Sequence, residues 1–86
     1  MNINQLIEII KKKIKTNIDI ENINIEDKSY LHKNHKGNEK DRFHIKISLE
    51  SKQLKEMTKI DANKKIYKIL SEEMNKSIHS LQILIN

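Results

Sequence analysis

The chain has 86 residues and a formal net charge of +5; 36% of the residues are hydrophobic and only 3% are aromatic. This length holds one domain, residues 1–86, with a thin aliphatic core. Because cysteine is absent, disulfides, thiolate zinc sites and cysteine nucleophiles are excluded, and the chain alone cannot hold an iron–sulfur cluster by four thiolates. No apolar run is long enough for a bilayer and no signal-peptide pattern is present, so we expect a soluble, cytoplasmic protein without membrane association.

The excess of positive charge has two explanations. A basic surface can bind nucleic acid or an anionic membrane. However, lysine, isoleucine and asparagine are all abundant, and a single arginine accompanies the many lysines. All three abundant residues have A/T-rich codons, so we favour genomic base composition over selection for an anionic ligand.

The first predicted element is an amphipathic helix over residues 3–15. Its apolar residues recur at three- and four-residue steps and form one stripe: Ile3, Leu6, Ile7, Ile10 and Ile14. Four lysines fall in its last turns, where cations stabilise the negative end of the helix dipole. The lysine run therefore has a structural explanation.

Two segments with alternating apolar residues predict strands at 20–26 and 42–49. In the second, one face is apolar: Phe43, Ile45, Ile47 and Leu49. The other face is polar, and we expect His44 on it to be solvated. Residues 27–41 form a long polar connection that contains His32, His35 and the only glycine, Gly37. Connections of this size in compact domains often carry function.

The C-terminal third predicts a helix over residues 60–75 and a strand over 78–85, after a turn at 50–55. An apolar stripe marks the helix: Ile60, Ile66, Ile69, Leu70 and Met74. Asp61 lies near its start, and residues 75–77 are predicted to end it. In the strand, alternation places His79 on the apolar face, together with Leu81, Ile83 and Ile85.

The predicted order of elements is α-β-β-α-β, with no internal repeat or linker. Two helices on one face of a three-stranded mixed sheet would bury every apolar stripe, so we predict a two-layer α+β domain. The first two strands should pair antiparallel across the long connection. A helical crossover then makes the third strand parallel to the second, with right-handed connection.

This topology brings histidines together. His79 should lie at the end of the sheet that carries the long connection, and neighbouring strands are only about 4.8 Å apart. His79, His32 and His35 therefore form a candidate metal-ligand set, and imidazole suits iron, zinc and copper alike. Alternatively, the two loop histidines are solvated side chains, and the His79 ring is hydrogen-bonded to backbone at the strand end.

An ordered set of short motifs resembles the BolA-like protein family along nearly the whole chain. The family pattern is an acid–Ser strand end, a loop with His or Cys, a Phe-led strand ending in Ser, a Tyr-x-x-Leu-x-x-Glu-Glu helix and a strand opening with His. The matching residues are Glu26–Asp27–Ser29, His32, Phe43 with Ser48, Tyr67–Leu70–Glu72–Glu73, and Ile78–His79–Ser80–Leu81.

The resemblance implies a fold related to type II KH domains and a heterodimer with a monothiol glutaredoxin. The two proteins would share a glutathione-containing [2Fe–2S] cluster, for cluster trafficking or for iron or redox sensing. The ligands implied in this chain are His79 and His32, with His35 as the alternative to His32, as in the histidine-loop subgroup. The isolated protein is then expected to be a monomer that binds no cofactor tightly.

The alternative function is a transcriptional regulator that binds nucleic acid through its KH-like surface, using Lys64, Lys65 and Lys68. KH modules clamp the nucleic-acid backbone with a Gly-x-x-Gly loop, which a chain with one glycine cannot build. The chain also departs from the family's Arg–His–Arg helix motif, with Ala62–Asn63–Lys64 in its place. No nucleophile elbow or Gly-rich phosphate loop is present, so we do not expect an enzyme.

Overall fold

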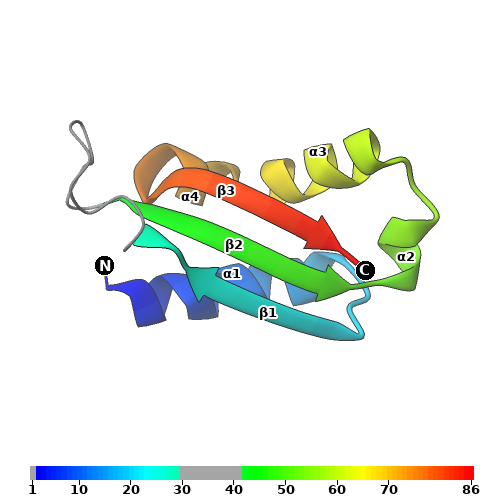
Figure 1. Cartoon of the computed structure of the whole chain (residues 1–86), viewed down its shortest axis with the longest axis horizontal. Coiled ribbons are helices and arrows are strands. Elements are labelled where there is room, and N and C mark those ends of the chain that lie inside the picture. Colours follow the sequence, from blue (N-terminus) through cyan, green and yellow to red (C-terminus); the bar gives the residue numbers. More distant parts are fainter. Residues whose placement is uncertain (1, 30–41) are drawn as a thin grey trace.

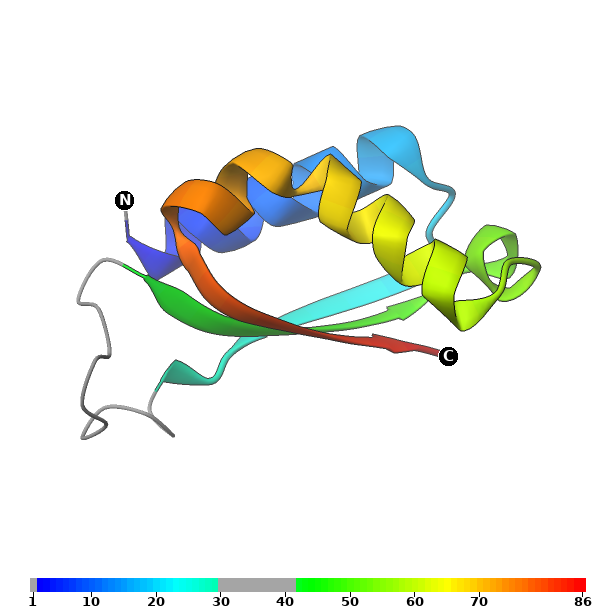
Figure 2. The ribbon, with the colours of Figure 1, turned by 90° about the horizontal axis from the view of Figure 1, so that it is seen from above.

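The computed structural model describes residues 2–29 and 42–86. Its elements are α1 (Ile3–Asn17), β1 (Asn22–Asp27), β2 (Phe43–Glu50), α2 (Lys52–Lys55), α3 (Lys59–Ile69), α4 (Ser71–Lys76) and β3 (Ile78–Ile85). The strands form one sheet in the order β1-β2-β3, and α1, α3 and α4 cover one of its faces (Figures 1 and 2). The predicted two-layer α+β class is confirmed.

The sheet is mixed, as predicted. β1 pairs antiparallel with β2, with Ile25 opposite Ile47. β2 pairs parallel with β3, with Ile47 opposite Ile83. The helices between β2 and β3 therefore carry the chain back along the helical face, so that β3 starts at the same end of the sheet as β2.

The core lies between the helices and the sheet. The predicted stripe of α1 supplies Leu6, Ile10 and Ile14, which are completely buried. They meet Ile47 from the centre of the sheet and Ile66 from α3 in the same cluster. A capping box starts α1: the side chains of Asn2 and Gln5 each accept a backbone hydrogen bond from the other residue.

Near residue 70, the structure differs from the single helix predicted over 60–75. α3 and α4 meet at Leu70, whose φ of −98° and ψ of 18° interrupt the helix. Leu70 is completely buried, so its side chain continues the apolar stripe through the interruption. The second helix then ends at Lys76, within the segment predicted to terminate it.

The turn predicted at 50–55 contains the short helix α2. Ser51 caps it and is completely buried. Its hydroxyl donates to the carbonyl of Asp19 at 2.7 Å and accepts from the backbone N–H of Leu54 at 3.2 Å. This turn is thereby tied to the segment that joins α1 to β1.

Among residues 2–29 and 42–86, no helix is long and apolar enough to cross a membrane.

Candidate functional site

His79 lies in an irregular stretch at the start of β3. Phe43 of β2 is opposite Ile78, but the next residue, His44, is opposite Ser80. β3 therefore uses two residues where β2 uses one, and His79 is the additional residue of a β-bulge. Bulges of this kind reorient a side chain without ending the strand pairing.

The bulge corrects the predicted orientation of His79. Ile78 is 1% exposed and belongs to the core, and Leu81 also packs against the core. These residues are three apart, so strict alternation is broken between them. His79 is exposed, and its ring lies against that of His44, with ring centroids 4.8 Å apart and planes at 62°. It therefore sits on the face that the helices leave open, and the prediction that it shares a face with Leu81 is wrong.

The prediction that His44 is solvated is also wrong. His44 does lie on the face opposite the core, but only 6% of it is exposed. Its Nδ1 is 2.6 Å from Ser80 Oγ, within hydrogen-bonding distance, and its ring meets His79 edge to face. The buried His44 ring therefore packs against one side of the exposed imidazole of His79.

The backbone around His44 is held by the end of β1. The His44 N–H donates to Ser29 Oγ at 3.1 Å, and the His44 carbonyl accepts from the Lys28 N–H at 2.7 Å. The Ser29 N–H in turn donates to Asp27 Oδ1 at 2.9 Å. Asp27 and Ser29, two residues of the acid–Ser motif, therefore hold the end of β1 against the His44 backbone through hydrogen bonds.

A second set of contacts fixes the start of β3. The Arg42 guanidinium donates to the carbonyls of Met74 and Asn75, at 3.2 and 2.8 Å, at the C-terminal end of α4. The Phe43 N–H donates to the Ser77 carbonyl at 2.8 Å. The chain therefore enters β3 at a defined position relative to β2, one residue before the bulge.

Of the three predicted histidine ligands, only His79 lies within the described residues. His79 lies at the predicted end of the sheet, where β1 ends and β2 begins. Its ring forms no hydrogen bond with any residue in 2–29 or 42–86, so the backbone-bonded alternative is not observed there. His32 and His35 lie outside the described residues. Within the described ranges, no three His, Cys, Asp or Glu side chains are grouped to hold a metal ion.

Sequence reasoning missed the packing of His44 and the contact with Ser80. Strict alternation assigns His44 and His79 to opposite faces, because it counts every residue of β3. Only the register of β2 against β3 reveals the bulge, and no residue of this strand marks it by type.

The lysines of the alternative nucleic-acid site all lie on α3. Lys64 and Lys68 are exposed and Lys65 is half-buried. Their spacing of three and four residues places Lys64, Lys65 and Lys68 on neighbouring positions of the helix surface. None of them forms an ion pair with another residue of the described part.

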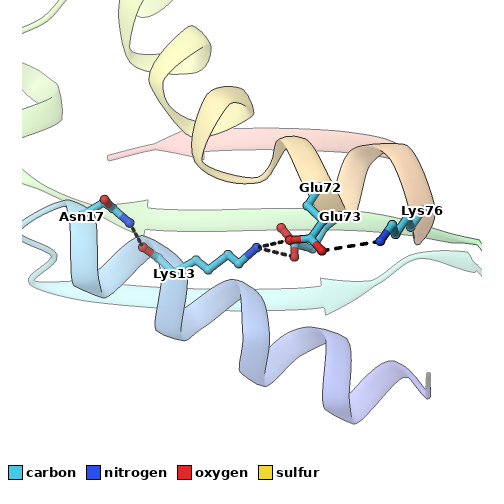
Figure 3. A network of polar contacts seen from close by, with 5 residues as sticks. All are labelled: Lys13, Asn17, Glu72, Glu73 and Lys76. Carbon is cyan, nitrogen blue, oxygen red and sulfur yellow. Dashed lines mark hydrogen bonds and ion pairs between the residues drawn. The ribbon is translucent and has the colours of Figure 1, made fainter.

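One lysine of α1 has a role that the helix dipole does not describe. Lys13 Nζ is 2.6 Å from Glu73 Oε2 and 3.4 Å from Glu72 Oε2, and Lys76 is 3.6 Å from Glu72 (Figure 3). The Glu73 side chain is only 7% exposed, and its Oε1 accepts no hydrogen bond within the described part of the chain. Lys13 therefore joins α1 to α4, the helix that leads into β3.

This network shifts the pKa values of Lys13 and Glu72. The hydrogen bond to Glu73 raises the pKa of Lys13 above its ordinary value of 10.5; burial opposes this shift, and the charge of Glu73 and the hydrogen bond and charge of Glu72 add to it. The hydrogen bond from Lys13, followed by the charges of Lys13 and Lys76, lowers the pKa of Glu72 below 4.5. Both shifts favour the charged forms that bridge the two helices.

Sequence comparison identifies relatives of this chain. A family model described as "BolA-like protein" matches residues 14–86. The chain is 35% identical over 76 residues to "DNA-binding transcriptional regulator BolA" of Haemophilus influenzae, which covers 88% of this chain and 71% of that protein. It is 28% identical over 78 residues to "Protein BOLA1, chloroplastic" of Arabidopsis thaliana, covering 87% of this chain but 49% of that longer protein.

Solved structures give the same result for the fold. The BolA domain of SufE1 from Arabidopsis thaliana superposes with a TM-score of 0.77 at 22% identity, covering 100% of this chain and 93% of that chain. BolA1 from the same plant gives 0.75 at 28% identity, covering 90% and 85%. With the family match over residues 14–86, the conclusion is that this chain belongs to the BolA-like protein family.

Proposed function

We propose that this chain is an iron–sulfur accessory protein that binds a monothiol glutaredoxin. The two proteins share a glutathione-containing [2Fe–2S] cluster, which is cargo or signal. His79 supplies one ligand, and His32 or His35 supplies another. The partner and glutathione supply the thiolates, since this chain contains no cysteine.

The observation that supports this proposal is the state of His79. Its imidazole is exposed at the end of the sheet where β1 ends and β2 begins, and its ring is not hydrogen-bonded within the described residues. The bulge and the His44 ring limit its orientations. A ligand held in this way loses little conformational freedom on binding a metal.

The chemistry of the donor set fits such a cluster. Imidazole is a ligand of iron, and a neutral imidazole in place of an anionic thiolate raises the reduction potential of a [2Fe–2S] centre, as in Rieske proteins. This chain's part is to present nitrogen donors at one sheet end. Two donors complete a site only together with a partner, which accords with binding in a heterodimer.

The test is an anaerobic titration of this protein into a glutathione-bound, cluster-loaded monothiol glutaredoxin, followed by visible absorption and circular dichroism. We expect a saturable spectral change at equal stoichiometry. His79→Ala should retain the far-ultraviolet spectrum of the folded protein and lose this change. Of His32→Ala and His35→Ala, one should lose the change and the other should keep it, which assigns the loop ligand.

Two results would count against the proposal. If the wild-type protein neither binds the glutaredoxin nor changes its spectrum, the shared-cluster function is wrong. If binding occurs but His79→Ala gives the wild-type spectral change, His79 is not a ligand.

A transcriptional regulator is the second candidate, because the Haemophilus influenzae relative bears the name of a DNA-binding regulator. Lys64 and Lys68 are exposed on α3 and could contact phosphates. A DNA duplex titrated at low and high salt distinguishes the two cases. A sequence-dependent complex weakened by Lys64→Glu would favour this function, whereas binding that is independent of sequence and lost at modest salt is electrostatic attraction alone.

A further inference from the structure

A groove of about 250 Å³ lies at the opposite end of β3 from His79. It is bounded by α2, the start of α3 and the last residues of β3. Its apolar lining includes Leu54, Met57 and Ala62, and its charged lining consists of Lys55 and Lys59. Leu84 is five positions after His79 in β3, so the groove is about 17 Å along the strand from the histidine.

The outer side of β3, away from β2, pairs with no other strand of the described residues at this groove. β3 is an edge strand of the sheet. The Leu81 carbonyl points away from β2, since it accepts a hydrogen bond from the Tyr67 hydroxyl at 3.0 Å. The Asn86 N–H points toward β2, where it donates to the Leu49 carbonyl at 2.8 Å.

The alternation of a strand then fixes the residues between these two contacts. The N–H and C=O groups of Ile83 and Ile85 point outward, on the same side as those of Leu81. Tyr67 covers the edge at Leu81, but no residue in 2–29 or 42–86 bonds the outward groups of Ile83 and Ile85. The outward backbone groups of β3 are therefore open along the stretch that lines the groove.

The charged residues that line the groove are both positive, and exposed apolar side chains lie beside them. Two large exposed apolar side chains belong to the segments that form it: Leu84, which is 47% exposed, and Ile60, which is 68% exposed. Lys55 and Lys59 line the groove, and no acidic residue does. Neither lysine forms an ion pair within the described part of the protein.

We propose that this groove and open edge bind an extended segment of a partner protein, in which apolar residues alternate with Asp or Glu. The segment adds to β3 as a fourth strand, with its backbone paired to Ile83 and Ile85. Its apolar side chains enter the groove, and its carboxylates meet Lys55 and Lys59. Such strand addition combines backbone hydrogen bonds for affinity with side-chain pockets for specificity.

The positive lining favours an acidic segment over a second copy of this chain as the occupant. Pairing of two β3 edges would bring Lys55 and Lys59 of both copies together, and like charges across an interface oppose association. The proposed site does not depend on the cluster function, because it is separate from His79.

The probe is a synthetic octapeptide with blocked ends in which valine and leucine alternate with glutamate. It is titrated into the isotope-labelled full chain and followed by amide chemical shifts. We expect saturable changes at Ile83, Ile85 and α2, and slower hydrogen exchange of the Ile83 and Ile85 amides. The same peptide with lysine in place of glutamate should bind at least about tenfold more weakly.

Charge-reversed variants test the role of the lysines. Lys55→Glu combined with Lys59→Glu should weaken binding of the acidic peptide about tenfold. Lys12→Glu combined with Lys15→Glu makes the same charge change on exposed lysines of α1 and should alter the affinity less than about twofold. Thermal unfolding of each variant checks that the fold is retained.

Three results would overturn the proposal. The first is an absence of saturable shift changes with the acidic peptide. The second is an equal loss of affinity in both pairs of variants, which would show only attraction to the net charge. The third is concentration-dependent broadening at Ile83 and Ile85 without peptide, together with dimers in sedimentation, which would assign the edge to a second copy.

Discussion

The orientation of His79 depends on a single additional residue in β3. Without the bulge, alternation would turn this imidazole toward the helices, beside Leu81. With it, His79 lies on the open face against His44, and Ser80 is positioned to bond His44 Nδ1. The sequence was sufficient to place His79 at the correct end of the sheet, because connection order determines strand direction. It was not sufficient to place the side chain, since the bulge appears only in the pairing register.

We predict that His44→Ala loosens His79 without unfolding the protein. The substitution removes the ring contact with His79 and the hydrogen bond to Ser80. It should lower the free energy of unfolding by about 1–2 kcal/mol, because a buried side chain and its hydrogen bond are lost. Ring proton relaxation of His79 should show increased motion, whereas Ser80→Ala should give a smaller effect. Unchanged His79 ring dynamics in His44→Ala would contradict the role assigned to His44.

At the scale of elements, α1 and α4 are joined by an ion pair with one buried member. Lys13 and Glu73 are distant in sequence, and periodicity gives no sign of such a contact; the helix dipole was a sufficient local explanation for the lysines. The junction at Leu70 was missed for a related reason. A buried leucine continues the apolar stripe, so the pattern fits one continuous helix although two are present. α1, β2 and β3 were predicted well because their faces differ strongly in polarity.

We predict that Lys13→Met destabilises the protein by about 1–2 kcal/mol, since it leaves the Glu73 carboxylate buried and unpaired. The cost is below that of a fully buried pair because Lys13 is 33% exposed. Lys13→Met combined with Glu73→Leu should recover most of the loss. Denaturant unfolding measures the cycle, and Lys12→Met on the exposed side of α1 is the matched control. A double variant as unstable as Lys13→Met would contradict this account.

The pH dependence of this joint follows from the two shifted groups. The raised pKa of Lys13 gives stability that is complete below 10.5 and lost as pH rises through the folded-state value. The lowered pKa of Glu72 gives stability that is complete above 4.5 and lost as pH falls through the folded-state value. The stability difference between wild type and Lys13→Met should therefore decrease above about pH 10.5, as Lys13 loses its proton, and below about pH 4.5, as Glu72 gains one. A difference that stays the same on both sides would contradict the role assigned to these two groups.

At the scale of the whole molecule, β3 connects two separate surfaces. Its first residues carry His79 on the open face, and its last residues line the groove beside α2 and α3. Helical contacts fix its course: Arg42, just before β2, donates to the Asn75 carbonyl at the end of α4, and Tyr67 of α3 donates to the Leu81 carbonyl in β3. A partner segment on the groove would therefore leave His79 accessible.

We expect the acidic peptide to bind wild type and His79→Ala with equal affinity, and a difference above about threefold would show that the two ends are coupled.

The most direct test of the central claim is pulsed electron paramagnetic resonance of the reduced cluster in the heterocomplex. The chain is labelled with a nitrogen isotope in histidine only, while the glutaredoxin is unlabelled. Our account predicts strong couplings from directly bound imidazole nitrogens, one set of which disappears in His79→Ala. A complex that forms but shows no coupling to the labelled histidines would contradict it.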